Sequence, residues 1–200
     1  MAERLIIFTR YPEPGTTKTR LIPVLGAKGA ARLQRQMTEQ TMAQVRSLQA
    51  SRPLSVEIYF TGGNREQMQA WLGSDLTYRQ QGEGDLGVRM ASAFEASFAT
   101  GITGAILIGT DCPDLRDQLM ERAFQTLEYH DLILGPAQDG GYYLIGLRRL
   151  IPELFVGISW GSDLVRQQTV EIAQRLDLAI AYLPILTDID RPEDLVGCSQ

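Results

Sequence analysis

Histidine and cysteine are scarce in this sequence, which contains one histidine and two cysteines among 200 residues. Cys112 and Cys198 have no zinc-ligand spacing, and two cysteines provide no disulfide framework. His130 stands beside Asp131 at the expected end of a helix, where capping is the favoured role of a histidine. A zinc motif or a disulfide scaffold is therefore excluded as the basis of the fold.

Long apolar runs are also missing. No run approaches the ~20 residues that a membrane-spanning helix needs. No secretory signal precedes the first apolar segment, Leu5 to Phe8. We expect a cytoplasmic protein without membrane insertion.

Positive charge is in short supply over the whole chain. The net charge is −5, which argues against nucleic acid as the main partner. The first 50 residues nevertheless carry eight lysines and arginines against three acidic residues. This local excess favours an anion site near the N-terminus, although a solvated helix face would give the same count.

The remaining composition is that of a soluble globular protein. Hydrophobic residues make up 44% and charged residues 22%, and the length fits one domain, residues 1–200, without repeats or linkers. Strand-like apolar segments alternate with helix-like amphipathic segments, which is typical of a doubly wound α/β sheet. We expect strands at 4–9, 54–60, 76–80, 105–108, 131–136, within 137–147 and at 179–185, and helices at 27–48, 65–72, 88–100, 116–127 and 163–176.

Segment 105–115 is the clearest functional candidate. Its first four residues are all apolar, as in a strand buried on both faces, and Asp111 and Asp114 follow the break at Gly109. In open α/β sheets the ligand lies outside the carboxyl ends of the strands. Asp111 is therefore well placed to hold a divalent metal ion and, through it, a phosphate. Capping of the next helix by Asp111 or Asp114 explains this segment alone equally well.

The loop after the first expected strand, residues 10–21, is a second candidate. Two prolines and Gly15 prevent regular structure, and Lys18 and Arg20 add positive charge where the chain turns back. Such a loop suits phosphate groups, but it is neither a Walker A loop nor a GxGxxG motif. The alternative is an ordinary surface loop with two exposed bases.

Segment 81–90 places three glycines ahead of an expected helix. Its backbone amides are suited to contact a nucleobase or an anion, with Glu83, Asp85 and Arg89 as further contacts. Alternatively, the segment is a flexible connector in which Asp85 only caps the helix.

Three further features occur late in the chain. Residues 139–141 form an expected tight turn between strands, which either only reverses the chain or faces a sugar or acceptor. Trp160 either lines an acceptor pocket or covers the core. Asp188 and Asp190 alternate on an extended segment and so point to one side, where a cation would relieve their repulsion. Helix capping by Asp190 is the alternative.

Five motifs follow one another along the chain: Pro14-Gly15-x-x-Lys18-Thr19-Arg20-Leu21, Gln81-Gly82-x-Gly84-Asp85-Leu86-Gly87, Gly109-Thr110-Asp111-Cys112-Pro113-Asp114-Leu115, Gly135-Pro136-Ala137-x-Asp139-Gly140-Gly141-Tyr142-Tyr143-Leu144 and Asp188-Ile189-Asp190. Together they resemble a bacterial family of small transferases, the DUF2064 proteins, over essentially the whole chain. This family is similar to the nucleotide-diphospho-sugar transferases of the GT-A fold. The resemblance implies a single-domain α/β three-layer sandwich, with a mostly parallel central sheet between helices. The lysine–threonine–arginine–leucine segment and the strand-end aspartate also look like those of phospholactate guanylyltransferases.

The resemblance gives each motif a role. It implies nucleotide binding by Arg10, Pro14, Gly15, Lys18, Arg20, Gly84, Asp85 and Gly87. It implies that Asp111, Asp188 and Asp190 bind Mg²⁺ or Mn²⁺, and that Asp111, Lys18 and Arg20 act in catalysis. It places Asp139, Gly140, Gly141 and Trp160 on the sugar or acceptor side. Trp160-Gly161-Ser162 departs from the Trp-Ser-Thr expected in much of the family.

The expected function is that of a metal-dependent transferase with a nucleotide-activated donor, first of all a nucleotide-sugar glycosyltransferase with a small-molecule acceptor. The alternative is a guanylyltransferase-like nucleotidyltransferase, in which a phosphorylated substrate attacks a nucleoside triphosphate and pyrophosphate leaves. A third possibility is a nucleotide-binding protein without catalysis. The released product, nucleoside diphosphate or pyrophosphate, distinguishes the first two.

Overall fold

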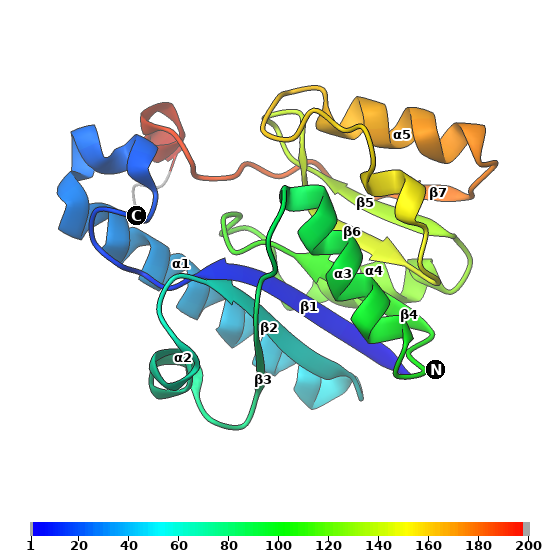
Figure 1. Cartoon of the computed structure of the whole chain (residues 1–200), viewed down its shortest axis with the longest axis horizontal. Helices are drawn as coiled ribbons and strands as arrows, with labels where there is room; N and C mark the ends of the chain where they lie inside the picture. Colours follow the sequence, from blue (N-terminus) through cyan, green and yellow to red (C-terminus); the bar gives the residue numbers. More distant parts are fainter. Residues whose placement is uncertain (1, 198–200) are drawn as a thin grey trace.

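The computed structural model describes residues 2–197, and within this range the strands form one seven-stranded sheet (Figure 1). Their order is β3-β2-β1-β4-β6-β5-β7. Neighbouring strands pair in parallel, except that β6 is antiparallel to both β4 and β5. The strands are β1 (Glu3–Arg10), β2 (Ser55–Thr61), β3 (Thr77–Gln80), β4 (Gly104–Ile108), β5 (Leu132–Pro136), β6 (Tyr142–Leu147) and β7 (Ile180–Tyr182).

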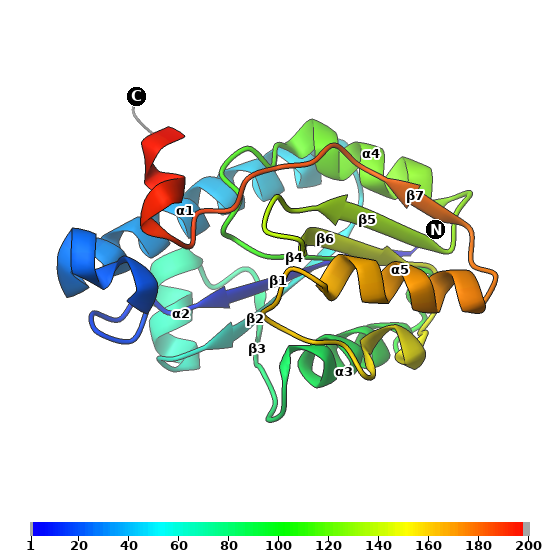
Figure 2. The same ribbon diagram turned by 90° about the horizontal axis from the view of Figure 1, so that it is seen from above.

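Helices cover both faces of the sheet (Figure 2). The α-helices are α1 (Ile22–Ser51), α2 (Arg65–Leu72), α3 (Leu86–Phe98), α4 (Asp117–Leu127) and α5 (Val165–Arg175). Three short 3₁₀ helices are η1 (Thr19–Leu21), η2 (Pro152–Phe155) and η3 (Pro192–Gly197). Side chains of α1, α2 and α4 share one core with the sheet, and those of α3, α5 and η2 share the other. The predicted three-layer α/β sandwich with a mostly parallel sheet is confirmed.

Strand β1 shows how the sequence supports two cores. Leu5 and Ile7 belong to the core under α1 and α4, whereas Ile6 and Phe8 belong to the core under α3 and α5. Successive side chains of a strand point to opposite faces. A run of apolar residues without polar alternation therefore fills both cores, as expected for a central strand of a parallel sheet.

Several element boundaries differ from the expected ones, among them those of α1, α5 and β7. Helix α1 begins at Ile22, five residues before the expected start, because Pro23 fits a first helical turn and Gly26 takes a positive φ of 67° at a kink. Helix α5 begins at Val165, after a loop in which the Ser162 hydroxyl accepts a hydrogen bond from Leu164 N–H. Strand β7 is limited to three residues and pairs only with β5.

The remaining sequence expectations concern membrane insertion and the scarce residues. Within residues 2–197, no helix combines the length and the apolar character that crossing a membrane requires. His130 donates from Nδ1 to the carbonyl of Thr126 at the end of α4, so its predicted capping role is confirmed. Cys112 is buried, and Cys198 lies outside the described residues.

Candidate functional site

Five segments meet where the parallel strands end, at what we call the carboxyl edge of the sheet. Because β6 runs against β4 and β5, its first residues lie at this edge as well. The segments are 11–21 after β1, 109–116 after β4, 137–141 between β5 and β6, 159–164 before α5 and 186–190 after β7. Backbone hydrogen bonds join them, from Ile189 to Asp111 (2.9 Å), from Gln138 to Leu186 (3.0 Å) and from Arg166 to Gly140 (3.0 Å).

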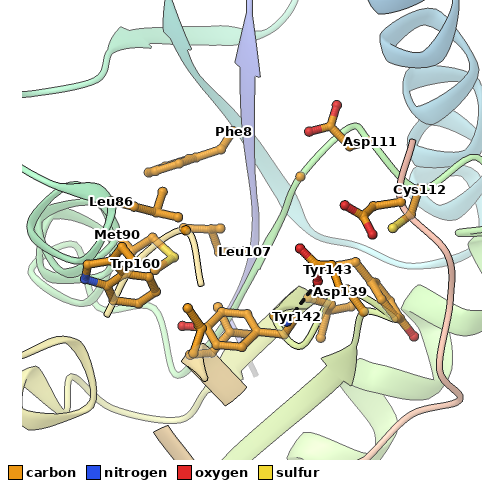
Figure 3. Close-up of a pocket in the computed structure, with 18 of the residues that line it drawn as sticks. Phe8, Leu86, Met90, Leu107, Asp111, Cys112, Asp139, Tyr142, Tyr143 and Trp160 are labelled. Atoms are coloured by element: carbon orange, nitrogen blue, oxygen red, sulfur yellow. Dashed lines mark hydrogen bonds between the residues drawn. The ribbon is translucent and has the colours of Figure 1, made fainter. Parts of the chain in front are cut away.

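Two cavities adjoin each other at the carboxyl edge. The apolar cavity, of about 320 Å³, lies next to the start of α3 and β6. The polar cavity, of about 710 Å³, is lined by Arg20, Arg191 and several acidic residues. Residues that line both are Asp139, Gly161, Ser162 and Asp188. Figure 3 shows the apolar cavity with Phe8, Leu86, Met90 and Trp160 on one side and Asp111, Cys112 and Tyr143 on the other.

Three carboxylates, those of Asp111, Asp139 and Asp188, line the apolar cavity. Burial raises the pKa of Asp188 above its ordinary value, and the negative charges of Asp139, Asp194 and Asp111 raise it further. Burial and the same kind of neighbours raise the pKa of the Cys112 thiol, so this cysteine stays protonated at neutral pH. The electrostatics at this point therefore favour a bound cation.

Lys18 connects two of the segments. Its backbone is left-handed, with φ of 45°, and its side chain is only 4% exposed. The Nζ group donates to the carbonyl of Ile189 at 2.5 Å and lies 2.9 Å from Oδ1 of Asp111. Lys18 thus ties the first loop, the strand-end aspartate and the C-terminal segment together, and its role towards phosphate stays a prediction.

Asp190 contacts two basic side chains. Arg20 Nη1 contacts its Oδ2 at 2.5 Å, and Lys18 Nζ lies 3.9 Å from its Oδ1. Among residues 2–197, no three or more histidine, cysteine, aspartate or glutamate side chains are grouped to hold a metal ion. Basic side chains thus contact Asp190, and metal binding by Asp111, Asp188 and Asp190 stays a prediction.

Helix capping resolves differently for each acidic residue. Asp85 Oδ1 accepts a hydrogen bond from Val88 N–H at 2.9 Å, so Asp85 caps α3. Neither Asp111 nor Asp114 caps α4. The N-cap residue of this helix is Arg116, whose side chain makes no capping hydrogen bond. Asp190 does not cap η3 either: Asp194 Oδ2 accepts from the backbone N–H groups of residues 190 and 191.

Glycines 84 and 87 play separate parts in the segment before α3. Gly84 is exposed with φ of +100°. Gly87 is buried, and a Cβ at this position would lie 2.6 Å from both the carbonyl oxygen of Phe155 and Nε1 of Trp160. Gly87 therefore permits close packing of α3 against the loop that carries Trp160. Nucleotide binding by Gly84, Asp85 and Gly87 stays a prediction.

The first loop is held by its own hydrogen bonds and keeps an open surface. Arg10 Nη1 donates to the carbonyl of Thr16 at 2.6 Å, and Arg10 Nε donates to the Thr61 hydroxyl. Pro14 and Gly15 are exposed, and no atom lies within 4 Å of a Cβ built on Gly15. The loop thus offers exposed backbone next to Arg10 and Arg20.

The turn at 139–141 and Trp160 form the other side of the site. Asp139 Oδ1 accepts from Gly141 N–H at 2.8 Å, which confirms the predicted tight turn. A Cβ on Gly140 would lie 2.2 Å from the carbonyl oxygen of Asp163, so the turn packs directly on the loop before α5. Trp160 lines the apolar cavity and also packs against the core, edge-on to Tyr142.

Sequence reasoning missed a buried polar cluster beside Asp111. The hydroxyls of Thr9, Thr38 and Thr110 lie 3.1 to 3.4 Å apart, and Gln34 Nε2 donates to Thr38 and Thr110. All four residues are buried. Two signals could have indicated this cluster. Thr9 and Thr110 lie at or just after the end of a strand, and Gln34 and Thr38 are four residues apart on α1.

Comparisons with known proteins agree with this fold. The model of a family described as "Uncharacterized protein conserved in bacteria (DUF2064)" matches residues 30–162. A solved structure of a candidate nucleotide-diphospho-sugar transferase from Desulfovibrio desulfuricans G20 is 37% identical, with a TM-score of 0.90. The match covers 98% of this chain and 85% of that one.

Two curated proteins are similar over part of the chain. A 3-phospho-D-glycerate guanylyltransferase of Phenylobacterium zucineum (strain HLK1) is 34% identical over 53% of this chain and 47% of its own length. A 2-phospho-L-lactate guanylyltransferase of Methanopyrus kandleri (strain AV19) is 31% identical over 46% of this chain and 48% of its own length. The chain thus matches about half the length of these curated relatives.

Proposed function

The chain belongs to the DUF2064 family, and on this premise we propose that it is a nucleotidyltransferase acting on a phosphorylated small molecule. The observation that carries the proposal is the meeting of the basic side chains of Arg20 and Arg191 with the carboxylates of Asp111 and Asp188 at the carboxyl edge. This edge lies where the strand order reverses between β1 and β4, the usual ligand position in open α/β sheets. The curated guanylyltransferases support this reading over glycosyl transfer.

In the proposed reaction, an oxygen of the acceptor's phosphate attacks the α-phosphorus of a nucleoside triphosphate. The bond from the α-phosphorus to the oxygen bridging to the β-phosphate breaks, and pyrophosphate leaves with the electron pair. Arg20 and Arg191 face the polar cavity and would stabilise the charge that develops on the leaving group. Lys18 holds Asp111 in place through its 2.9 Å contact.

A divalent cation fits the residues present. Asp111 and Asp188 line one cavity, and the pKa of Asp188 is raised by burial and by neighbouring carboxylates, whereas Asp111 already has Lys18 as a partner. Mg²⁺ commonly uses one or two carboxylates together with substrate phosphates, so a third protein carboxylate is not needed. Bound there, Mg²⁺ or Mn²⁺ would neutralise charge on the transferred phosphate.

A nucleotide-sugar glycosyltransferase is the second candidate. It is favoured by the similarity over 98% of this chain to a candidate nucleotide-diphospho-sugar transferase. The same cavities would then hold the sugar of the donor, and nucleoside diphosphate would be the product.

One assay separates the two candidates. The purified protein is incubated with Mg²⁺ and each of GTP, ATP, CTP and UTP plus a panel of phosphate monoesters, and in parallel with nucleotide sugars plus sugar acceptors. Pyrophosphate release that requires both a triphosphate and a phosphate monoester is the expected result. If nucleoside diphosphate is released from the nucleotide-sugar mixtures and no mixture releases pyrophosphate, the proposal is wrong and glycosyl transfer replaces it.

A further inference from the structure

The charged residues that line the apolar cavity are all acidic. Its charged residues are Asp111, Asp139 and Asp188, and none of its lining residues within 2–197 is lysine, arginine or histidine. Its other walls are mostly aliphatic and aromatic, with Phe8, Met90, Leu107, Tyr142 and Trp160 among them, and Ser162 and several glycines complete the lining. A ligand group inside it therefore meets mainly apolar surface and negative charge.

The polar cavity has the opposite character. Arg20 and Arg191 line it, and Lys18 is buried close to it through its contact with Asp190. A triphosphate needs cationic partners, and of the two cavities only the polar one has basic residues among the described residues of its lining. The nucleoside triphosphate chain is thus assigned to the polar cavity, and the adjoining apolar cavity is left for the body of the acceptor.

An acceptor carboxylate would have no basic partner among the described residues that line the apolar cavity, because the nearby Lys18 is already engaged by Asp111 at 2.9 Å and by the carbonyl of Ile189 at 2.5 Å. Burying a charge without a counter-charge costs several kcal/mol, and the three aspartates would add repulsion. The named substrates of the curated relatives, 3-phospho-D-glycerate and 2-phospho-L-lactate, both combine a phosphate with a carboxylate. The lining of this cavity is unsuited to that second acidic group.

We propose that the acceptor of this protein is a small phosphate monoester whose remaining part is largely apolar and carries no carboxylate or other second anionic group. This inference rests on the proposed nucleotidyl transfer and names its substrate class. The phosphate of the acceptor would lie where the two cavities adjoin, beside Gly161 and Ser162, which line both, so that it faces the basic residues of the polar cavity, and the uncharged remainder would fill the cavity of about 320 Å³. The substrates of the two curated relatives are accordingly not the substrates of this chain.

The test compares matched pairs that differ by one charge. Pyrophosphate release is measured with Mg²⁺ and GTP, ATP, CTP or UTP, using 2-phospholactate against its methyl ester and 3-phosphoglycerate against its methyl ester. We expect kcat/KM to be about 100-fold higher for each ester, the factor that ~2.7 kcal/mol of uncompensated charge burial produces. Equal or faster reaction of the free acids would overturn the inference and leave the proposed function standing.

A charge-introducing variant sharpens the test. Leu86 is the first residue of α3, is 37% exposed and lines the apolar cavity, so Leu86→Arg adds a cation there with little loss of packing. It should raise kcat/KM for the free acids about 10-fold. Val88→Arg, at a 51% exposed position of the same helix outside the cavity lining, should leave the preference unchanged. An effect of Leu86→Arg confined to the KM of the nucleotide would place the nucleobase in this cavity and refute the inference.

A binding measurement covers the case in which no mixture releases pyrophosphate. That outcome rejects the proposed function, so the same acid and ester pairs are titrated calorimetrically into the Mg²⁺-loaded protein. Tighter binding of the esters upholds the charge preference of the cavity. Equal binding of acid and ester, or binding of neither, overturns it.

Discussion

Acidic side chains at the two edges of the sheet have opposite surroundings. At the amino edge, where β1 and β2 begin, Glu3 receives hydrogen bonds from Arg52 Nε and Nη2 at 2.5 and 2.7 Å. Glu57 contacts both Arg4 at 3.0 Å and Arg79 at 2.9 Å. Each buried acid there has at least one arginine partner, and the pKa of Arg52 is raised chiefly by its hydrogen bond to Glu3.

At the carboxyl edge the acids outnumber the bases that face them. Asp111, Asp139 and Asp188 line the apolar cavity, and Lys18 contacts only the first of them. The pKa of Asp188 is raised, so its charged form is destabilised in the folded protein. The comparison teaches that acids at the amino edge are paired with arginines, whereas the acids at the carboxyl edge outnumber their basic partners, which leaves negative charge at the proposed site.

The strongest test of this comparison replaces an acid at the carboxyl edge. Asp188→Asn should lower pyrophosphate release at least about 100-fold, because it removes a carboxylate that would hold the cation at the transferred phosphate. Its melting temperature should be unchanged or higher, since an acid with a raised pKa destabilises the folded state when charged. The matched control is Asp114→Asn, an exposed residue that lines neither cavity. A lower melting temperature without loss of activity would contradict the comparison.

The reciprocal change is made at the amino edge. Glu3→Gln leaves Arg52, which is 15% exposed, with weaker partners, and should cost about 2 kcal/mol of unfolding free energy. Turnover per folded molecule should stay the same. Urea unfolding and kinetic assays measure the two quantities. Glu128 touches the same arginine from a 36% exposed position at 3.7 Å, so Glu128→Gln should have almost no effect.

Lys18 is where the two kinds of role overlap. Lys18→Met should lower activity about 10-fold and destabilise the protein by about 1 kcal/mol, because Asp111 and the carbonyl of Ile189 lose their shared donor. Initial rates and thermal unfolding check both. Normal rates with reduced stability would assign Lys18 to structure alone, and Lys28→Met, on the exposed surface of α1, serves as the control.

The smallest effect is expected in the buried threonine cluster. Thr38→Val keeps the shape but removes a hydroxyl that contacts both Thr9 and Thr110, and should cost about 1 kcal/mol of stability. Because Thr110 precedes Asp111, activity should also fall a few-fold. Thr41→Val, buried on the same helix outside the cluster, is the control. Equal kinetic effects of the two variants would exclude a positioning role for the cluster.

The sequence predicted the layers of the fold well, because local patterns encode them. The uninterrupted apolar residues 105–108 predicted a central strand, and the helix predicted at 65–72 is α2, which begins at a capping box of Asn64 and Gln67. Asp85 also caps its helix as one interpretation held. Such features depend on neighbours within a few residues, which a single sequence displays directly.

The pairing within the site was less accessible to sequence reasoning. Lys18 bonds to Ile189 across 171 residues, and Arg20 bonds to Asp190 across 170. No local pattern shows that Arg20 forms an ion pair with Asp190 whereas Asp188 lines the apolar cavity. The alternation of residues 188 and 190 was read correctly, since Ile189 between them is buried and both aspartates line the polar cavity, but their different partners come from the tertiary fold.

The bond between Lys18 and Ile189 also bears on how the protein assembles. It closes a chain loop of nearly the whole molecule, and the entropic cost of closure grows only with the logarithm of loop length. The sheet can form from nearer pairings, such as the β5–β6 hairpin, before this closure takes place. We therefore expect the carboxyl edge to be completed after these nearer pairings, when the segment after β7 reaches Asp111. Release of the chain from residue 187 onward would dismantle the site but leave the two cores that flank the sheet in place, because Ile189 belongs to a separate cluster with Leu21, Ala30 and Met37.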